Sequence, residues 1–286
     1  MDYVDAQHVE GIYFKEKDLD SQPKDVEMVS VKENSESINA RYDMDRNKEN
    51  LALIINNESF DESTGMPERQ GSDEDASKIK KSLKSLHFEV IDHNNLSVKE
   101  MTQIFTDISR MDLAKYNCFV CVILTHGEDD NQIYGTDGKV NLDTLVEMLL
   151  PNRCPGLIGK PKLFFIQACR VKKMDSGKDV VDAARETHEK VTSHKLPVWA
   201  DFLLAYSTVS GFYSWRNSTT GTWFIQSLAH ILERHGDRLE LQHLMLSVNR
   251  KVAYEYESDT WEPEINEKKQ VPSIVSMLTK QLYFYK

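Results

Sequence analysis

Short apolar runs alternate along this chain with segments whose apolar residues recur at helical spacing. The runs have the length and content of buried strands, and they cover residues 51–55, 118–124, 162–167, 202–208 and 274–277. Parallel strands need long crossover connections, which are usually helices. The alternation therefore predicts an α/β fold in which helices pack on a mostly parallel sheet.

Several predicted helices carry boundary signals. We expect Ser72 to cap the first helix. Ser97 and Glu100 have the spacing of a capping box before the second. A further helix is expected near residues 142–150, and a later one should end at Gly236.

The net charge of −11 is concentrated at the start of the 286-residue chain, where residues 1–50 hold 13 acidic against 7 basic residues. Residues 1–45 lack a sustained apolar period, so we expect a disordered extension there. The acidic balance disfavours nucleic acid as a partner. No apolar segment is long enough to span a bilayer, and the start of the chain does not resemble a signal peptide. These features predict a soluble, cytoplasmic protein without membrane partners.

The four cysteines suggest a reducing compartment without a disulfide framework. Cys118 and Cys121 have a spacing that also occurs in metal sites. Residues three apart in a strand, however, point to opposite faces of the sheet, so the two thiols cannot ligate one ion together. We therefore expect no metal site.

A thiol and an imidazole stand at the ends of two predicted strands. His126 follows one apolar run and Cys169 follows another, 43 positions later. The carboxyl ends of parallel strands line the ligand crevice of such sheets, so the two residues can meet there. A lone cysteine is more often a small buried hydrophobe. A cysteine and a histidine that both end strands, however, together predict a nucleophile and its base. We expect the N–H groups of Gly127 and Cys169 to face the developing oxyanion.

Several motifs in the same order resemble an effector (executioner) caspase over about residues 42–286. They are Asn56-Asn57 with Ser63-Thr64-Gly65-Met66, Phe119 to Val122, Gly159 to Leu163, the signature Gln167-Ala168-Cys169-Arg170 with its upstream histidine, Tyr213 to Ser218, and Ile274 to Lys280. The resemblance implies a caspase-like three-layer αβα sandwich around a six-stranded, mostly parallel sheet. It also implies a cysteine protease that cuts protein substrates after aspartate, executes apoptosis, needs no cofactor and forms a homodimer along its final strand.

Composition and resemblance together divide the chain into a short prodomain (1–45), a large subunit (46–175), a cleavable linker (176–195) and a small subunit (196–286). The linker is charged and poor in large apolar side chains, which indicates exposure. Its segment Asp179-Val180-Val181-Asp182 resembles a substrate, so an initiator caspase is expected to cut after Asp182, with Asp175 as the second choice. Asp5 and Asp20 are weaker candidates for trimming the tail. Caspase inhibitor proteins are further expected partners.

A substrate aspartate must leave water on binding, and an unpaired buried carboxylate is very costly. Its pocket therefore needs planar cationic donors, and Arg69 and Arg216 match the family's arginines. A single loop arginine is more often a solvated surface charge. The resemblance also assigns Gln167 to the wall of this S1 pocket. It assigns the backbone of Ser214, Trp215 and Arg216 to pairing with the substrate. Trp215 and Trp223 are expected to wall the P2 and P4 pockets, and Asn217 to hold the P4 side chain.

Three features depart from the family pattern. Val171 stands where the family usually has glycine and would resist a positive φ. The insert 128–132 is slightly long, and Glu262 and Glu264 could repel a P4 aspartate. Val171 leaves open a catalytically weakened homologue that acts as a dimerising regulator or decoy, although a decoy needs neither nucleophile nor base. A relative that cleaves after basic residues would need acidic groups at the two arginine positions.

Overall fold

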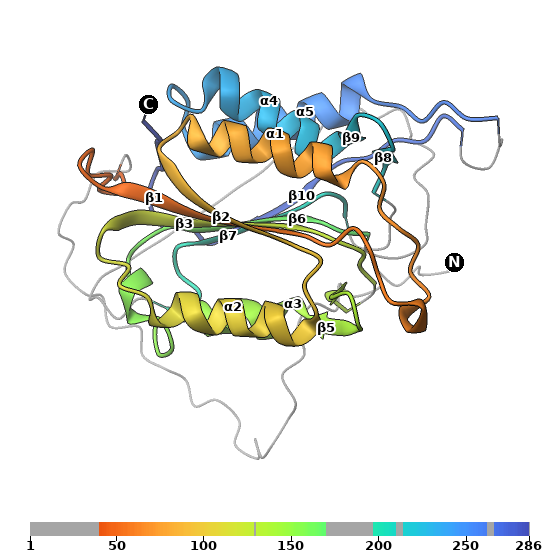
Figure 1. Cartoon of the computed structure of the whole chain (residues 1–286). Helices are drawn as coiled ribbons and strands as arrows, with labels where there is room; N and C mark the ends of the chain where they lie inside the picture. The colour runs from red at the N-terminus through yellow and green to blue at the C-terminus, as the bar shows by residue number, and fades with distance from the viewer. Residues whose placement is uncertain (1–39, 129, 170–196, 210–213, 262–265, 286) are drawn as a thin grey trace, which may run out of the picture. The chain divides into compact units, whose positions relative to one another are not determined.

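The computed structural model describes residues 40–128, 130–169, 197–209, 214–261 and 266–285. Its central sheet has the strand order β10-β7-β6-β3-β1-β2 (Figure 1). The strands are β1 (Glu49–Asn56), β2 (Phe88–Asn94), β3 (Tyr116–Leu124), β6 (Lys162–Gln167), β7 (Phe202–Tyr206) and β10 (Ser273–Ser276). All pair in parallel except β10, which is antiparallel to β7. The predicted six-stranded, mostly parallel sheet is confirmed.

Helices cover both faces of the sheet, which confirms the three-layer sandwich (Figure 1). On one face lie α1 (Ser72–Lys84), α4 (Trp223–His235) and α5 (Leu241–Glu255), and on the other α2 (Val98–Arg110) and α3 (Leu142–Val146). Successive strand residues alternate between the two cores. Ile54 belongs to the core under α1, α4 and α5, whereas Leu53 belongs to the core under α2 and α3. Because both faces are buried, the strands read as continuous apolar runs.

The smaller elements complete the described chain. Two short hairpins are formed by β4 (Gln132–Tyr134) with β5 (Lys139–Asn141) and by β8 (Arg216–Asn217) with β9 (Gly221–Thr222). Short 3-10 helices cover Glu62–Thr64, Glu147–Leu149 and Pro155–Leu157. No helix among the described residues is long and apolar enough to cross a membrane.

The cysteines behave as the strand pattern predicts. Cys118 lies in one core and Cys121 in the other, so the two thiols point to opposite faces of β3. Burial raises the pKa of both thiols. None of the four cysteines is in a disulfide, and only Cys169 is not fully buried.

Two of the helix boundaries predicted from the sequence agree with the structure, and one does not. Ser97 and Glu100 form the predicted capping box at α2, and Gly236 ends α4. Ser72 is not the cap of α1, because Gly71, at φ 84°, occupies the cap position and Ser72 is the first helical residue. Gly71 turns the chain in the left-handed conformation that glycine tolerates, so the boundary does not depend on a side-chain cap.

The disordered N-terminal extension was predicted to reach residue 45, but the described structure already begins at residue 40. Tyr42 and Met44 are buried in the core, and the Tyr42 hydroxyl donates a hydrogen bond of 2.6 Å to Asp201. Arg41 pairs with Gln281 near the end of the chain. Residues 40–45 therefore belong to the folded domain, because their apolar side chains have partners far along the chain. Residues 1–39 and the linker 176–195 lie outside the described residues.

Candidate active site

A cavity of about 390 Å³ lies where β3 and β6 end. The chain continues from β3 into His126 and from β6 into Cys169, and both side chains line this cavity. The other lining residues are Arg69, Thr125, Gln167, Ala168, Ser214, Trp215, Arg216 and Thr222. The structure thus brings the predicted nucleophile, base and arginines together at the carboxyl edge of the parallel sheet, as the strand order predicts.

Gly127 allows the histidine loop to approach the cysteine loop. A β-carbon on this residue would collide with the carbonyl oxygen of Cys169 and would lie 2.8 Å from the β-carbon of Ala168. Only glycine fits at this position without moving one of the two loops. The backbones of Gly127 and Cys169 therefore lie close together.

The His126 ring is held by a backbone carbonyl. Its Nε2 lies 2.8 Å from the Pro67 oxygen, and the Phe60 ring centroid is 4.9 Å from that of the imidazole. A carbonyl oxygen only accepts hydrogen bonds, so this contact places the proton of the neutral ring on Nε2. The Nδ1 lone pair is then available to accept a proton. The sequence reading missed Pro67, because a contact through a main-chain oxygen leaves no side-chain signature.

The surroundings of His126 favour the neutral imidazole. Burial, followed by the positive charges of Arg69 and Arg216, lowers the pKa of His126 to about 4, although the contact with Pro67 opposes this shift. The ring is therefore uncharged at neutral pH, which is the state a proton acceptor requires.

This electrostatic effect gives a testable prediction. In a ring-proton NMR titration, His126 should show a midpoint well below that of an exposed histidine, and Arg216→Ala should raise it because one neighbouring positive charge is lost. A short unstructured peptide that contains one histidine supplies the reference. A His126 midpoint equal to that of the peptide and unchanged by Arg216→Ala would contradict the interpretation.

Arg69 is a buried arginine, with only 2% of its surface exposed. Its Nη1 donates a hydrogen bond of 3.0 Å to the Asn57 carbonyl oxygen. Burial, followed by repulsion from Arg216, lowers the pKa of Arg69 to about 9, and burial also lowers the pKa of Arg216. Both guanidinium groups remain cationic at neutral pH. Two desolvated cations in one cavity form a receptor for an anion.

The remaining predicted substrate residues lie at the end of β6, in the two residues before β8 and at the start of α4. Gln167 donates a hydrogen bond of 2.6 Å from Nε2 to the Ser214 hydroxyl, and the Trp215 N–H donates one of 2.7 Å to Gln270 Oε1. The Trp215 ring stacks on Trp223, with centroids 5.8 Å apart. Trp215 therefore lines the cavity, whereas Trp223 supports it from behind.

Asn217 occupies a different position from the cavity residues. Its side-chain oxygen accepts hydrogen bonds from the N–H groups of Thr219 (2.8 Å) and Thr220 (3.0 Å), which stabilise the turn between β8 and β9. Asn217 does not line the cavity. The structure thus shows a turn-forming contact where the sequence predicted contact with the P4 side chain.

Some predicted features fall outside the described residues, namely Val171, Glu262, Glu264 and the cleavage candidates Asp5, Asp20, Asp175 and Asp182. Conversely, the sequence reading missed Thr125, Ala168, Thr222 and Gln270. The first two follow β3 and β6 directly, so their positions at strand ends could have indicated them. Thr222 and Gln270 depend on long-range packing, which leaves no local signal.

Comparisons with known proteins agree with this geometry. Residues 49–283 match the Caspase domain family. The chain is 46% identical over 248 residues to Caspase-3 of Mesocricetus auratus, covering 87% of this chain and 88% of the relative. It is 45% identical over 248 residues to Caspase-3 of Bos taurus, covering 87% and 89%, and 46% identical over 244 residues to that of Felis catus, covering 85% and 87%.

The chain belongs to the caspase family of cysteine proteases. It is an effector caspase, an aspartate-specific cysteine endopeptidase that executes apoptosis, with the dimeric organisation of that family. The comparisons do not favour a regulatory decoy. A specificity for basic residues is also disfavoured, because the described cavity lining contains two arginines and no carboxylate.

Proposed function

We propose that Cys169 is the nucleophile and His126 the general base of this protease. The Nδ1 lone pair of His126 takes the proton from Cys169 Sγ. The sulfur then attacks the backbone carbonyl carbon of the substrate's P1 aspartate. The N–H groups of Gly127 and Cys169 stabilise the negative oxygen of the tetrahedral intermediate. The proton then passes to the leaving amine as the C–N bond breaks, and His126 activates the water that hydrolyses the thioester.

The P1 carboxylate is bound by Arg69 and Arg216 in this proposal. The supporting observation is that both arginines line the same cavity as His126 and Cys169. The positive charge of Arg216 disfavours the charged form of Arg69, and a substrate aspartate bound between them would offset this repulsion. Gln167 forms part of the same wall. An aspartate bound there would also reduce the positive field at His126 and so strengthen it as a base.

The rest of the substrate is proposed to run along β8. The backbone from Ser214 to Arg216 pairs with it as an added strand. Trp215 forms an apolar wall for the neighbouring substrate side chain, and Trp223 supports Trp215 and helps to bound the P4 pocket. We keep Asn217 as a P4 contact through its exposed face, with its turn-forming hydrogen bonds fixing its position.

We further propose that this cytoplasmic enzyme is made as a zymogen with a large subunit (46–175), a small subunit (196–286) and a linker (176–195) that an initiator caspase cuts. The proposed prodomain covers residues 1–45, and residues 42 and 44 of it pack against the folded domain. Caspase inhibitor proteins are proposed to act on the mature enzyme at the same cavity.

Asp182 in the linker is the proposed activation site. Asp182→Ala should prevent cutting at this bond by an added active initiator caspase, so that activation slows strongly, whereas the parent protein should yield a fragment ending at Asp182. Intact-mass spectrometry after timed incubation measures both fragments. Glu189→Ala is the matched control, because it removes a negative charge from the same linker and leaves the segment Asp179 to Asp182 unchanged.

If Asp182→Ala is cut and activated as fast as the parent, and no parent fragment ends at Asp182, the assignment is wrong. Asp175→Ala is then the next variant to measure.

A further inference from the structure

Asp75 is a buried carboxylate that the proposed mechanism does not use. It lies on α1, is fully buried, and is absent from the cavity lining. The Thr222 N–H donates to its Oδ1 and Oδ2 at 2.9 and 3.0 Å, and Gln226 Nε2 donates to its Oδ1 at 2.7 Å. These partners lie 147 and 151 positions later in the chain. The contact therefore joins the proposed large subunit to the proposed small subunit.

The chain at β9 is shaped to receive this carboxylate. Gly221 has φ 93°, and a β-carbon there would collide with Asp75 Oδ1 and lie 2.6 Å from Gln226 Nε2. A side chain at position 221 would thus be strained by the backbone conformation and would also displace the carboxylate. The close approach of Asp75 to β9 depends on this glycine.

Thr222 connects Asp75 to the substrate-binding residues. It lines the cavity and pairs directly with Arg216 in the β8–β9 hairpin. The next residue, Trp223, donates its N–H to the Trp215 carbonyl oxygen at 3.4 Å. Asp75 therefore fixes one side of the hairpin whose other side carries Arg216 and Trp215.

Asp75 also balances the charge of the two pocket arginines. Its negative charge is the largest favourable influence on Arg69 and on Arg216 in the free protein. Because it lies behind the cavity, it stabilises the pair of cations without occupying the place of a substrate carboxylate. Removing this charge would leave the buried Arg69 and the half-buried Arg216 to repel each other.

We infer that Asp75 is a positioning residue for P1-aspartate recognition: through Thr222 and through its charge, it holds Arg216 and the substrate strand in their binding arrangement. This inference rests on the proposed role of Arg69 and Arg216. The buried carboxylate with its three hydrogen-bond contacts to β9 and α4 carries it.

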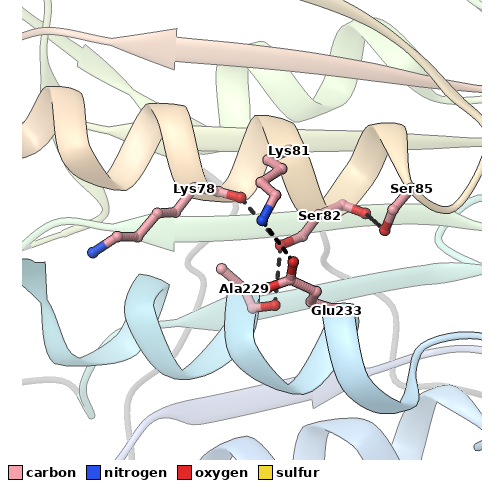
Figure 2. Close-up of polar contacts among 6 residues, drawn as sticks. All are labelled: Lys78, Lys81, Ser82, Ser85, Ala229 and Glu233. Atoms are coloured by element: carbon pink, nitrogen blue, oxygen red, sulfur yellow. Dashed lines mark hydrogen bonds and ion pairs between the residues drawn. The ribbon is translucent and has the colours of Figure 1, made fainter.

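Docking of α1 on α4 is a separate role, and it has its own contacts further along the helices. Ser82 Oγ donates to the Ala229 carbonyl oxygen at 3.0 Å, and Lys81 forms an ion pair of 2.8 Å with Glu233, as Figure 2 shows. Lys81→Ala therefore perturbs the helix contact without touching Asp75. This variant separates a loss of helix packing from a loss of pocket positioning.

The test compares Asp75→Asn with Asp73→Asn, which removes the same charge from an exposed position in the same helical turn. Asparagine removes the negative charge, and it replaces one of the two oxygens that accept from the Thr222 N–H with an NH2 group, which can only donate. After active-site titration, we expect Asp75→Asn to raise KM for a P1-Asp peptide at least about tenfold and to change kcat less than about threefold, because substrate binding is affected more than the chemical step. Asp73→Asn and Lys81→Ala should match the parent.

Hydrogen exchange provides a readout that does not need activity. In Asp75→Asn, the amide of Thr222 should exchange at least about tenfold faster than in Asp73→Asn, because a charged acceptor with two oxygens is replaced by one neutral amide oxygen. Gly221→Ala should show the same change, and it replaces Asp75→Asn if that variant does not fold.

The outcomes separate the inference from the proposed function. Unchanged KM together with unchanged Thr222 exchange would overturn the role of Asp75, even in an active protease. A parent protein that binds P1-Asp and P1-Ala peptides equally would overturn the proposed function, while the exchange measurement would still decide whether Asp75 holds the hairpin. A KM increase of the same size in Lys81→Ala would show that helix docking, and not Asp75, is responsible.

Discussion

Replacing Cys169 with alanine should lower peptide cleavage at least about 10⁴-fold, and His126→Ala should have an effect of similar size, because nucleophile and base act as one unit. Both side chains line the cavity, and neither contributes to the two hydrophobic cores. The fold should therefore be retained in both variants. Initial rates on a fluorogenic P1-Asp peptide measure the loss, and thermal unfolding measures the stability.

His243→Ala is the matched control, because this histidine is exposed on α5, away from the cavity lining. It should leave the rate unchanged. Retained turnover in Cys169→Ala would exclude this residue as the nucleophile. A large fall in the unfolding temperature of either variant would show that the side chain is structural.

Arg69→Ala and Arg216→Ala should each lower kcat/KM for a P1-Asp peptide by roughly a hundredfold or more. A charge-assisted hydrogen bond contributes about 1.5–3 kcal/mol, and truncating one arginine also leaves part of the buried substrate carboxylate unpaired. A matched peptide with alanine at P1 measures general damage to the site. Arg250→Ala, at an exposed position of α5, controls for the loss of a positive charge.

The two peptides distinguish the possible results. If kcat/KM falls equally for the P1-Asp and P1-Ala peptides, the arginines support the structure of the loop and do not select aspartate. This control matters most for Arg69, because its side chain also holds the Asn57 carbonyl oxygen.

The central sheet could be predicted from the sequence because its strands are buried on both faces. β3, for example, is fully buried and is apolar except for Asn117. The edge strand β2 was missed. It pairs only with β1. Apart from the buried Phe88, its residues are partly buried or exposed and include Asp92 and His93, so no apolar run marks it.

The candidate site was predictable where side chains of distinctive chemistry end strands, as His126 and Cys169 do. Arg69 gave a different result. A loop arginine usually reads as a surface charge, and its complete burial depends on packing against distant segments. Pro67 acts through its main-chain oxygen and Asp75 through partners about 150 positions away, so neither has a local pattern that sequence reading could detect.

The most direct measurement compares cleavage of two fluorogenic peptides, Asp-x-x-Asp and Asp-x-x-Asn, by the chain after treatment with an active initiator caspase. The peptides differ only in the charge of the P1 side chain, and the treated Cys169→Ala variant corrects for the activity of the added caspase. We predict rapid cleavage of the P1-Asp peptide, at least about a hundredfold slower cleavage of the P1-Asn peptide, and no cleavage above background by Cys169→Ala. Equal cleavage of both peptides, or unchanged cleavage by Cys169→Ala, would contradict an aspartate-specific protease that uses this cavity.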